Sequence, residues 1–142
     1  MILAPNGNGA LQADSGGNAR GVNAIDFQRA RTSNTQVAAG DYSSIGGGAR
    51  NAIAASSYST ISGGKLNTIE ASHSFSGIAG GEDNTVKSGG KHGCIGGGKL
   101  NEVADSYSVV GGGKGNSVSG NFSTVSGGLN NTTTAGLAAI AG

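Results

Sequence analysis

The sequence predicts an all-β fold, a parallel β-solenoid in which short strands stack as successive rungs. Three observations predict this fold. A unit of about 16 residues recurs through positions 39–142, the kind of short period that is typical of solenoids. Apolar residues hold fixed positions within the unit. The chain also has 29 glycines, three phenylalanines, three tyrosines and no tryptophan, which leaves too little apolar volume for a conventional globular core.

The repeat is centred on a column of aliphatic residues, defined here as position zero. Its members are Ile45, Ile61, Ile78, Ile95, Val110, Val125 and Ile140. A glycine pair follows at +2 and +3. An asparagine at +6 completes each of the first six units: Asn51, Asn67, Asn84, Asn101, Asn116 and Asn131. At +8 stands isoleucine or valine, or threonine in the last copy. Position −3 is mainly aromatic: Tyr42, Tyr58, Phe75, His92, Tyr107, Phe122 and Leu137.

Each unit is long enough for two short strands and two turns. β-branched and aromatic runs favour strands, and the glycine pairs mark turns. Helix is disfavoured because glycine costs roughly 1 kcal/mol relative to alanine at a helical site. The repeat therefore predicts about six rungs with a thin Ile/Val core. We expect the glycine pair to allow positive φ at a tight corner, and the asparagines to stack as an amide ladder or to cap a corner.

A core this thin favours association between chains. Three chains packed side by side would bury more apolar surface, so a homotrimer is expected, although another oligomer would meet the same need. Residues 1–38 lack the repeat and are predicted to be an N-terminal cap or attachment segment, in which Arg29 and Arg31 alternate as on an exposed strand. The chain stops inside a seventh unit, so we expect the natural protein to continue or a partner to cover this end.

Composition argues against several classes of protein. The formal net charge of +1 does not predict nucleic-acid binding, which requires a strongly basic face. Cys94 is the single cysteine, so no intrachain disulfide or cysteine-based zinc cluster is expected. The N-terminus lacks the pattern of a signal peptide, and no apolar stretch approaches the roughly 20 residues of a membrane helix. We expect synthesis in the cytoplasm, no membrane insertion and no cofactor.

No catalytic constellation emerges from the motifs. Residues 93–99 match part of a phosphate-binding loop, but position 100 is leucine, and the same Gly-Gly-Lys recurs in other units. Glycan hydrolases use paired carboxylates. Only Glu82 and Asp83 adjoin each other, and neighbouring strand residues point to opposite faces, which favours a solvated turn. We therefore predict that the protein is not an enzyme.

The remaining candidates are binding residues. His73 and His92 would allow a metal ion on a trimer axis, but His92 occupies the aromatic column, which favours a packing role. Cys94 shares a column with small residues and is interpreted as a tolerated small side chain. The +4 position carries three lysines that would contact acidic surface glycans, although a solvated corner that blocks lateral aggregation is the favoured interpretation. These lysines are Lys65, Lys99 and Lys114.

Two units carry a family resemblance. Residues 58–67 read Tyr-Ser-Thr-Ile-Ser-Gly-Gly-Lys-Leu-Asn, and residues 122–131 read Phe-Ser-Thr-Val-Ser-Gly-Gly-Leu-Asn-Asn. These units resemble the Ser-Gly-Gly-x-x-Asn repeats of phage and giant-virus fibre-like proteins, and residues 18–26 resemble the segment that precedes such repeats. The units are also similar to the YadA-like heads of trimeric autotransporter adhesins. The resemblance implies a trimeric left-handed β-roll and a role in surface attachment.

The expected function follows from this resemblance. It implies a structural virion protein, assembled in the host cytoplasm, that forms part of a trimeric tail fibre, spike or capsid fibre. Residues 1–38 and the C-terminal end would then join other virion proteins, and the rod would meet host surface glycans. The chain has no signal peptide, stalk or membrane anchor, which favours the virion over a bacterial cell-surface adhesin head. A non-catalytic part of a glycan-degrading tailspike is a further alternative.

Overall fold

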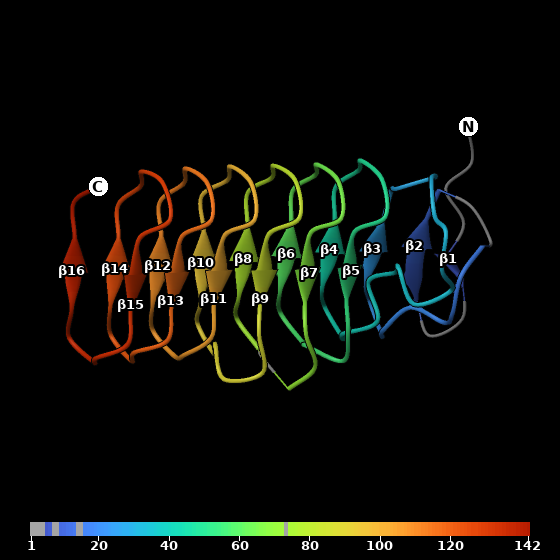
Figure 1. Ribbon diagram of the computed structural model, residues 1–142. Coiled ribbons are helices and arrows are strands. Elements are labelled where there is room, and N and C mark those ends of the chain that lie inside the picture. Colours follow the sequence, from blue (N-terminus) through green and yellow to red (C-terminus); the bar gives the residue numbers. More distant parts are fainter. Residues whose placement is uncertain (1–4, 7–8, 14–15, 73) are drawn as a thin grey trace.

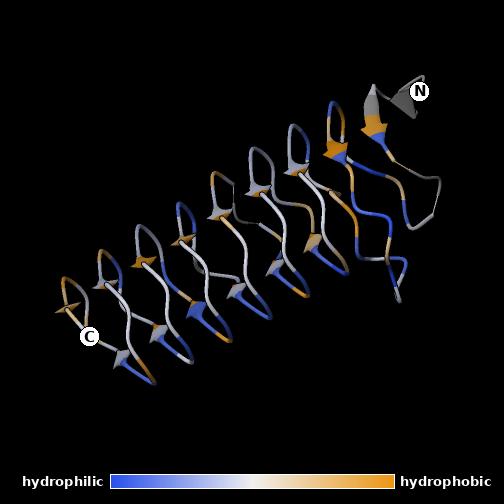
Figure 2. Ribbon diagram, turned by 90° about the horizontal axis from the view of Figure 1, so that it is seen from above, coloured by the Kyte–Doolittle hydropathy of each residue, from blue (hydrophilic) through white to orange (hydrophobic). Residues whose placement is uncertain are grey.

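The structure, a computed structural model, describes residues 5–6, 9–13, 16–72 and 74–142. Every regular element among these residues is a β-strand. The strands form a ten-stranded and a six-stranded sheet that run together along one elongated stack (Figure 1). Seen from above, the successive turns follow one another along this stack (Figure 2). The all-β parallel solenoid predicted from the repeat is confirmed.

Almost all strands are two residues long, because corners take up most of each turn. In spatial order, the ten-stranded sheet consists of β1 (Pro5–Asn6), β2 (Ala10–Gln12), β3 (Ile25–Asp26), β4 (Ser44–Ile45), β6 (Thr60–Ile61), β8 (Gly77–Ile78), β10 (Cys94–Ile95), β12 (Val109–Val110), β14 (Thr124–Val125) and β16 (Ala139–Ile140). The six-stranded sheet consists of β5 (Ala52–Ile53), β7 (Thr68–Ile69), β9 (Thr85–Val86), β11 (Glu102–Val103), β13 (Ser117–Val118) and β15 (Thr132–Thr133). β1 pairs with β2 in antiparallel orientation, and the pairs from β2 onward are parallel.

The strand register places equivalent residues directly beside one another. Ile45 pairs with Ile61, and Ile61 pairs with Ile78. The same register continues through β10, β12, β14 and β16. Units of unequal length therefore stack equally well, because the corners absorb the difference. The position-zero column predicted from the sequence is a continuous column in the fold.

The core is a single layer of aliphatic side chains between the two sheets. In both sheets from β4 to β14, the second residue of each two-residue strand points inward and is at most 1% exposed. The position-zero and +8 columns form one buried cluster, which Ile140 joins at the end of the stack. Complete burial of a side chain of this size contributes about 1.5–3 kcal/mol. Hydrophobic burial is thus divided almost evenly among the turns.

The stack extends into the N-terminal segment. β3 pairs in parallel with β4, and Asp26 stands opposite Ile45 at position zero. The solenoid consequently has about eight turns, where the sequence predicted about six. Arg31 is half-buried and donates to Asp26, so the prediction that it lies on an exposed strand is wrong. The boundary between residues 1–38 and 39–142 stays a prediction, although β2 and β3 belong to the same sheet as the repeats.

The second glycine of each pair occupies the tight corner that the repeat predicted. At Gly81, φ is +91°, and an added Cβ would lie 2.1 Å from the carbonyl oxygen of Gly98 in the next turn. Both the backbone conformation and the close approach therefore require glycine there. The first glycine of the pair is different, because an added Cβ at Gly80 would meet open space.

Candidate functional site

The asparagine column forms a continuous amide ladder, one of the two roles that the sequence left open. Asn84 is fully buried, and its backbone N–H and side-chain Nδ2 both donate to Oδ1 of Asn67, at 3.1 and 3.0 Å. Its Nδ2 also donates to the carbonyls of Gly80 and Gly98, each at 3.0 Å. Its own Oδ1 accepts from the backbone N–H of Asn101 at 3.0 Å. The ladder holds each glycine corner in place and joins it to the next.

Buried serines form a second polar column, which sequence analysis missed although a serine follows every Tyr and Phe at position −3. Gly93, which follows His92, interrupts this column. At position −2 these serines bond between turns: the Ser123 backbone N–H donates to Oγ of Ser108 at 3.2 Å, and Ser123 Oγ donates to the carbonyl of Ala135 at 2.9 Å. Short hydroxyl side chains suit this place because they satisfy backbone groups at the corner. The column comprises Ser43, Ser59, Ser76, Ser108 and Ser123.

Position −3 forms an exposed aromatic ladder along one edge of the rod. Consecutive rings stack with centroids 4.7–5.3 Å apart and interplanar angles of 2–11°. The Tyr and Phe members are 52–59% exposed, so their edges face solvent while their faces cover one another. We name this surface the aromatic ladder; its members are Tyr42, Tyr58, Phe75, His92, Tyr107 and Phe122.

His92 takes the packing position that the repeat indicated. Its ring stacks between Phe75 at 5.3 Å and Tyr107 at 4.7 Å. The other candidate histidine, His73, lies outside the described residues. Among the residues that the structure describes, no group of three His, Cys, Asp or Glu side chains is arranged to hold a metal ion.

The three predicted lysines lie along one corner, but a carboxylate separates two of them. Isolated parallel bridges connect Lys65 with Glu82, Glu82 with Lys99, and Lys99 with Lys114. Glu82 forms ion pairs with Lys65 at 3.5 Å and with Lys99 at 2.9 Å. The hydrogen bond from Lys99, followed by the attraction of Lys99 and Lys65, lowers the pKa of Glu82. None of the described residues forms an ion pair with Lys114.

Charged residues also mark the outer face of the six-stranded sheet. Lys87 pairs with Glu102 at 2.6 Å, and both side chains are partly exposed. The hydrogen bond and attraction from Glu102, with a smaller contribution from Glu70, raise the pKa of Lys87. Exposed pairs of this kind contribute little to stability, because water and salt screen the attraction between the two charges. The outer face of the six-stranded sheet therefore carries charged, partly exposed side chains at its middle turns.

The outer face of the ten-stranded sheet is uncharged over the repeats. It presents positions −1 and +1 of each unit, whose side chains are small or absent and are exposed or half-buried. We name it the small-residue face. Its members are Ser44, Thr60, Gly77, Cys94, Val109, Thr124 and Ala139 at −1, and Gly46, Ser62, Ala79, Gly96, Gly111, Ser126 and Ala141 at +1.

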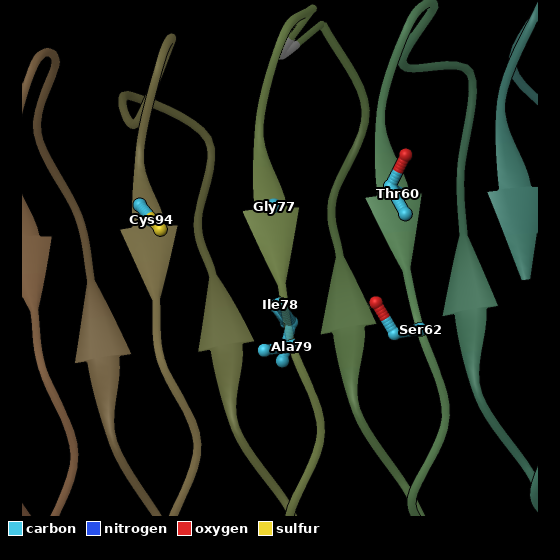
Figure 3. A pocket seen from close by; sticks show the side chains of 6 residues that line it. All are labelled: Thr60, Ser62, Gly77, Ile78, Ala79 and Cys94. Carbon is cyan, nitrogen blue, oxygen red and sulfur yellow. The ribbon is translucent and has the colours of Figure 1, made fainter.

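An open depression of about 230 Å³ interrupts the small-residue face (Figure 3). It spans β6, β8 and β10, and Thr60 and Cys94 flank it (Figure 3). Gly77 causes it, because the −1 column lacks a side chain there and an added Cβ would meet open space. Cys94 is exposed and free, in the column of small residues where the sequence placed it.

A buried charge cluster closes the N-terminal end of the core. Asp26 is fully buried and accepts from Arg20 Nε at 3.0 Å and from Arg31 Nη2 at 2.9 Å. Gln28 continues the polar layer, because its Oε1 accepts from the backbone N–H of Asn51 at 2.8 Å. Gln28 thus begins the asparagine ladder. Sequence analysis assigned no role to this cluster.

No family model, curated protein or solved structure matches this chain. No helix among the described residues is both long and apolar enough to cross a lipid bilayer. The fold and its ladders define the class of the protein, which is a parallel β-solenoid of stacked repeats.

Proposed function

We propose that this protein is a rigid segment of a homotrimeric fibre or spike on a virion, with a structural role in attachment to the host surface. The in-register parallel stack carries this proposal. Neighbouring turns bond through backbone pairing, and most turns of the repeat region also bond through the asparagine ladder and the buried serines, which produces a stiff rod with a repeated surface. The resemblance to viral fibre-like repeats supports the virion as its location and a left-handed coil as its form.

The small-residue face is the surface that a trimer would cover. The cores of protein interfaces are depleted of charged residues, and no member of this face is charged. Two other surfaces of the rod are charged: the corner that carries Glu82 and Lys99, and the outer face of the six-stranded sheet, which carries Lys87 and Glu102. Burial of the uncharged face leaves the charged surfaces in solvent.

Attachment would then draw on repeated weak contacts. Three identical rods held in parallel present every exposed column three times, and linked sites raise avidity without any new contact. Lys114 is the lysine best suited to an acidic glycan, because Lys65 and Lys99 share the charge of Glu82. Residues 1–38 and the C-terminal end are the parts that would join other virion proteins.

Oligomeric state tests the structural part of this proposal. We expect the purified chain to have the mass of a trimer, and mild oxidation to join Cys94 thiols of neighbouring copies. Val109→Glu on the small-residue face should yield monomers, whereas Ser117→Glu on the outer face of the six-stranded sheet should leave the trimer intact. A monomeric wild-type chain, or dissociation caused equally by both substitutions, would refute the assigned interface.

Two further measurements test location and attachment. The protein should copurify with virus particles and localise to a fibre or spike by immunogold labelling. On an array of acidic glycans, Lys114→Ala should weaken binding more than Lys65→Ala. Equal loss for both variants would contradict the role of Lys114, and absence from purified particles would contradict the virion proposal.

A further inference from the structure

We propose a covalent modification site at the start of the aromatic ladder: Tyr42 and Tyr58 form an intrachain dityrosine bond when a one-electron oxidant reaches them. Their ring centroids lie 5.0 Å apart, and their planes differ by 4°. Both side chains are accessible, at 52% and 53% exposed. Two phenols are thus held parallel, adjacent and open to solvent.

The backbone maintains this arrangement. The Tyr58 N–H donates to the carbonyl of Asp41 at 2.9 Å, so the residue that precedes Tyr42 is bonded directly to Tyr58. Both tyrosines have positive φ, 53° and 55°. The two side chains therefore leave equivalent corners of neighbouring turns in the same direction. A fixed geometry converts an encounter between two groups into a unimolecular step with a high effective concentration. Coupling within the chain therefore has an advantage over coupling between chains.

Tyr42 is also the end ring of the ladder. The Tyr42 N–H donates to the carbonyl of Val22, and the equivalent position of the preceding turn is Asn23, which has a φ of 54°. Among the described residues, Tyr42 therefore has an aromatic neighbour on one face only. Its ring can tilt and slide until an ortho carbon meets that of Tyr58. An interior ring with stacked neighbours on both faces has less freedom to do so.

The chemistry requires a stated oxidant, for which a haem peroxidase with hydrogen peroxide suffices. Each phenol loses one electron and its hydroxyl proton to the peroxidase, which leaves two tyrosyl radicals. The radicals combine through a new bond between their ortho carbons. The two hydrogens on those carbons then move to the oxygens as the rings regain aromaticity. In sum, two tyrosines and one hydrogen peroxide yield one dityrosine and two waters.

Tyr107 provides an internal comparison. It has the same exposure as Tyr58, at 53%, and nearly the same φ, at 56°. Its stacked neighbours, however, are His92 and Phe122. A radical on Tyr107 has no second phenol beside it in the ladder. Exposure alone thus predicts equal reactivity for these tyrosines, whereas the stacking order predicts coupling only at the first pair.

The experiment treats the purified full chain with peroxidase and limiting peroxide, followed by denaturing electrophoresis, dityrosine fluorescence and mass spectrometry. Trypsin places the three tyrosines in separate peptides, 32–50, 51–65 and 100–114, because it cleaves after Arg31, Arg50, Lys65, Lys99 and Lys114. We expect fluorescence in the band of a single chain. Peptides 32–50 and 51–65 should be joined, with a loss of two hydrogen atoms.

Matched variants decide the assignment. Phenylalanine occurs naturally in this column at Phe75 and Phe122, so Tyr-to-Phe changes preserve the ladder. Tyr42→Phe and Tyr58→Phe should each abolish the intrachain product, whereas Tyr107→Phe should leave its yield unchanged. Fluorescence confined to cross-linked dimers, a joined peptide 100–114, or no dityrosine in the treated wild-type chain would overturn the proposal.

Discussion

Replacement of Asn84 by alanine is the most direct test of the asparagine ladder. The change removes the Nδ2 donor to the carbonyls of Gly80 and Gly98, and it removes the Oδ1 that accepts from Asn101 N–H. Gly98 keeps a second donor in the backbone N–H of Glu82, but the described structure shows no substitute acceptor for Asn101 N–H. The variant thus leaves a buried donor unsatisfied in the middle of the stack.

The magnitude follows from the bonds that are lost. A buried polar group without a partner costs about 1–3 kcal/mol, and each lost hydrogen bond adds about 1 kcal/mol. We expect Asn84→Ala to lower the free energy of unfolding by about 3 kcal/mol. The matched control is Asn131→Ala, at the last position of the ladder, where no further asparagine follows in this chain. We expect that change to cost only about 1 kcal/mol.

Guanidinium unfolding followed by far-ultraviolet circular dichroism measures both variants at one protein concentration. The midpoint should shift while the slope stays that of the wild type, because a change in stability alone does not alter the surface exposed on unfolding. If Asn84→Ala were no more destabilising than Asn131→Ala, the ladder would not be a continuous chain of buried bonds, and our account of the corners would be refuted.

Three other substitutions test the corners, the ion pairs and the core. Gly81→Ala should lower the free energy of unfolding by at least about 2 kcal/mol in chemical denaturation, because it combines positive φ with a backbone clash. Gly80→Ala should be nearly neutral, and equal effects of the two substitutions would refute the different roles assigned to the two glycines. The hydrogen bond from Lys99 is the main reason that the pKa of Glu82 is lowered in the folded protein. The ionised Glu82 side chain therefore stabilises the fold above its ordinary pKa of 4.5, and this stabilisation is lost as the pH falls through the lower pKa of the folded state. Thermal unfolding across this range should therefore show Glu82→Gln below wild type at neutral pH and equal to it in acid, and a constant difference would contradict this. Ile78→Ala should lower stability by about 2–5 kcal/mol, since its fully packed site leaves a cavity, and a loss under about 1 kcal/mol would argue against a shared core.

The stacked columns were predictable because, in a solenoid, residues at the same position of consecutive repeats become neighbours in adjacent turns. Ile61 and Ile78 are paired in the structure as their positions in the repeat indicate. The amide ladder was predictable for the same reason, since Asn67 and Asn84 occupy one position of consecutive units. A single rung cannot bury its apolar face, so the repetition itself indicates what covers it.

The N-terminal turn escaped prediction because its spacing and chemistry differ from the repeat. The step from Asp26 to Ile45 is longer than any step between consecutive members of the position-zero column, and a carboxylate replaces the aliphatic side chain. The added length forms a corner in which Gln36 Oε1 accepts from the backbone N–H of Thr32 at 2.7 Å. The buried charge of Asp26 is tolerated only because Arg31 and other groups form ion pairs and hydrogen bonds with it in the folded chain.

The conformation of the aromatic ladder also lay beyond the sequence. Residues with a Cβ avoid the left-handed region by about 1–2 kcal/mol, so nothing local predicts that Tyr58 or Phe122 adopts it. The stacking of rings between turns and the hydrogen bonds of the corner offset this cost. Both are contacts between residues far apart in the chain.

The sequence by itself determined the stack, its register and the identity of its columns, because a periodic pattern states which residues become neighbours. Only the tertiary structure decided what those neighbours do. Lys65 and Lys99 belong to one column in either description, yet their pairing with Glu82 depends on side-chain directions at a corner. Periodicity specifies position along the rod, whereas exposure, charge pairing and ring stacking depend on distances that arise only when the turns are packed together.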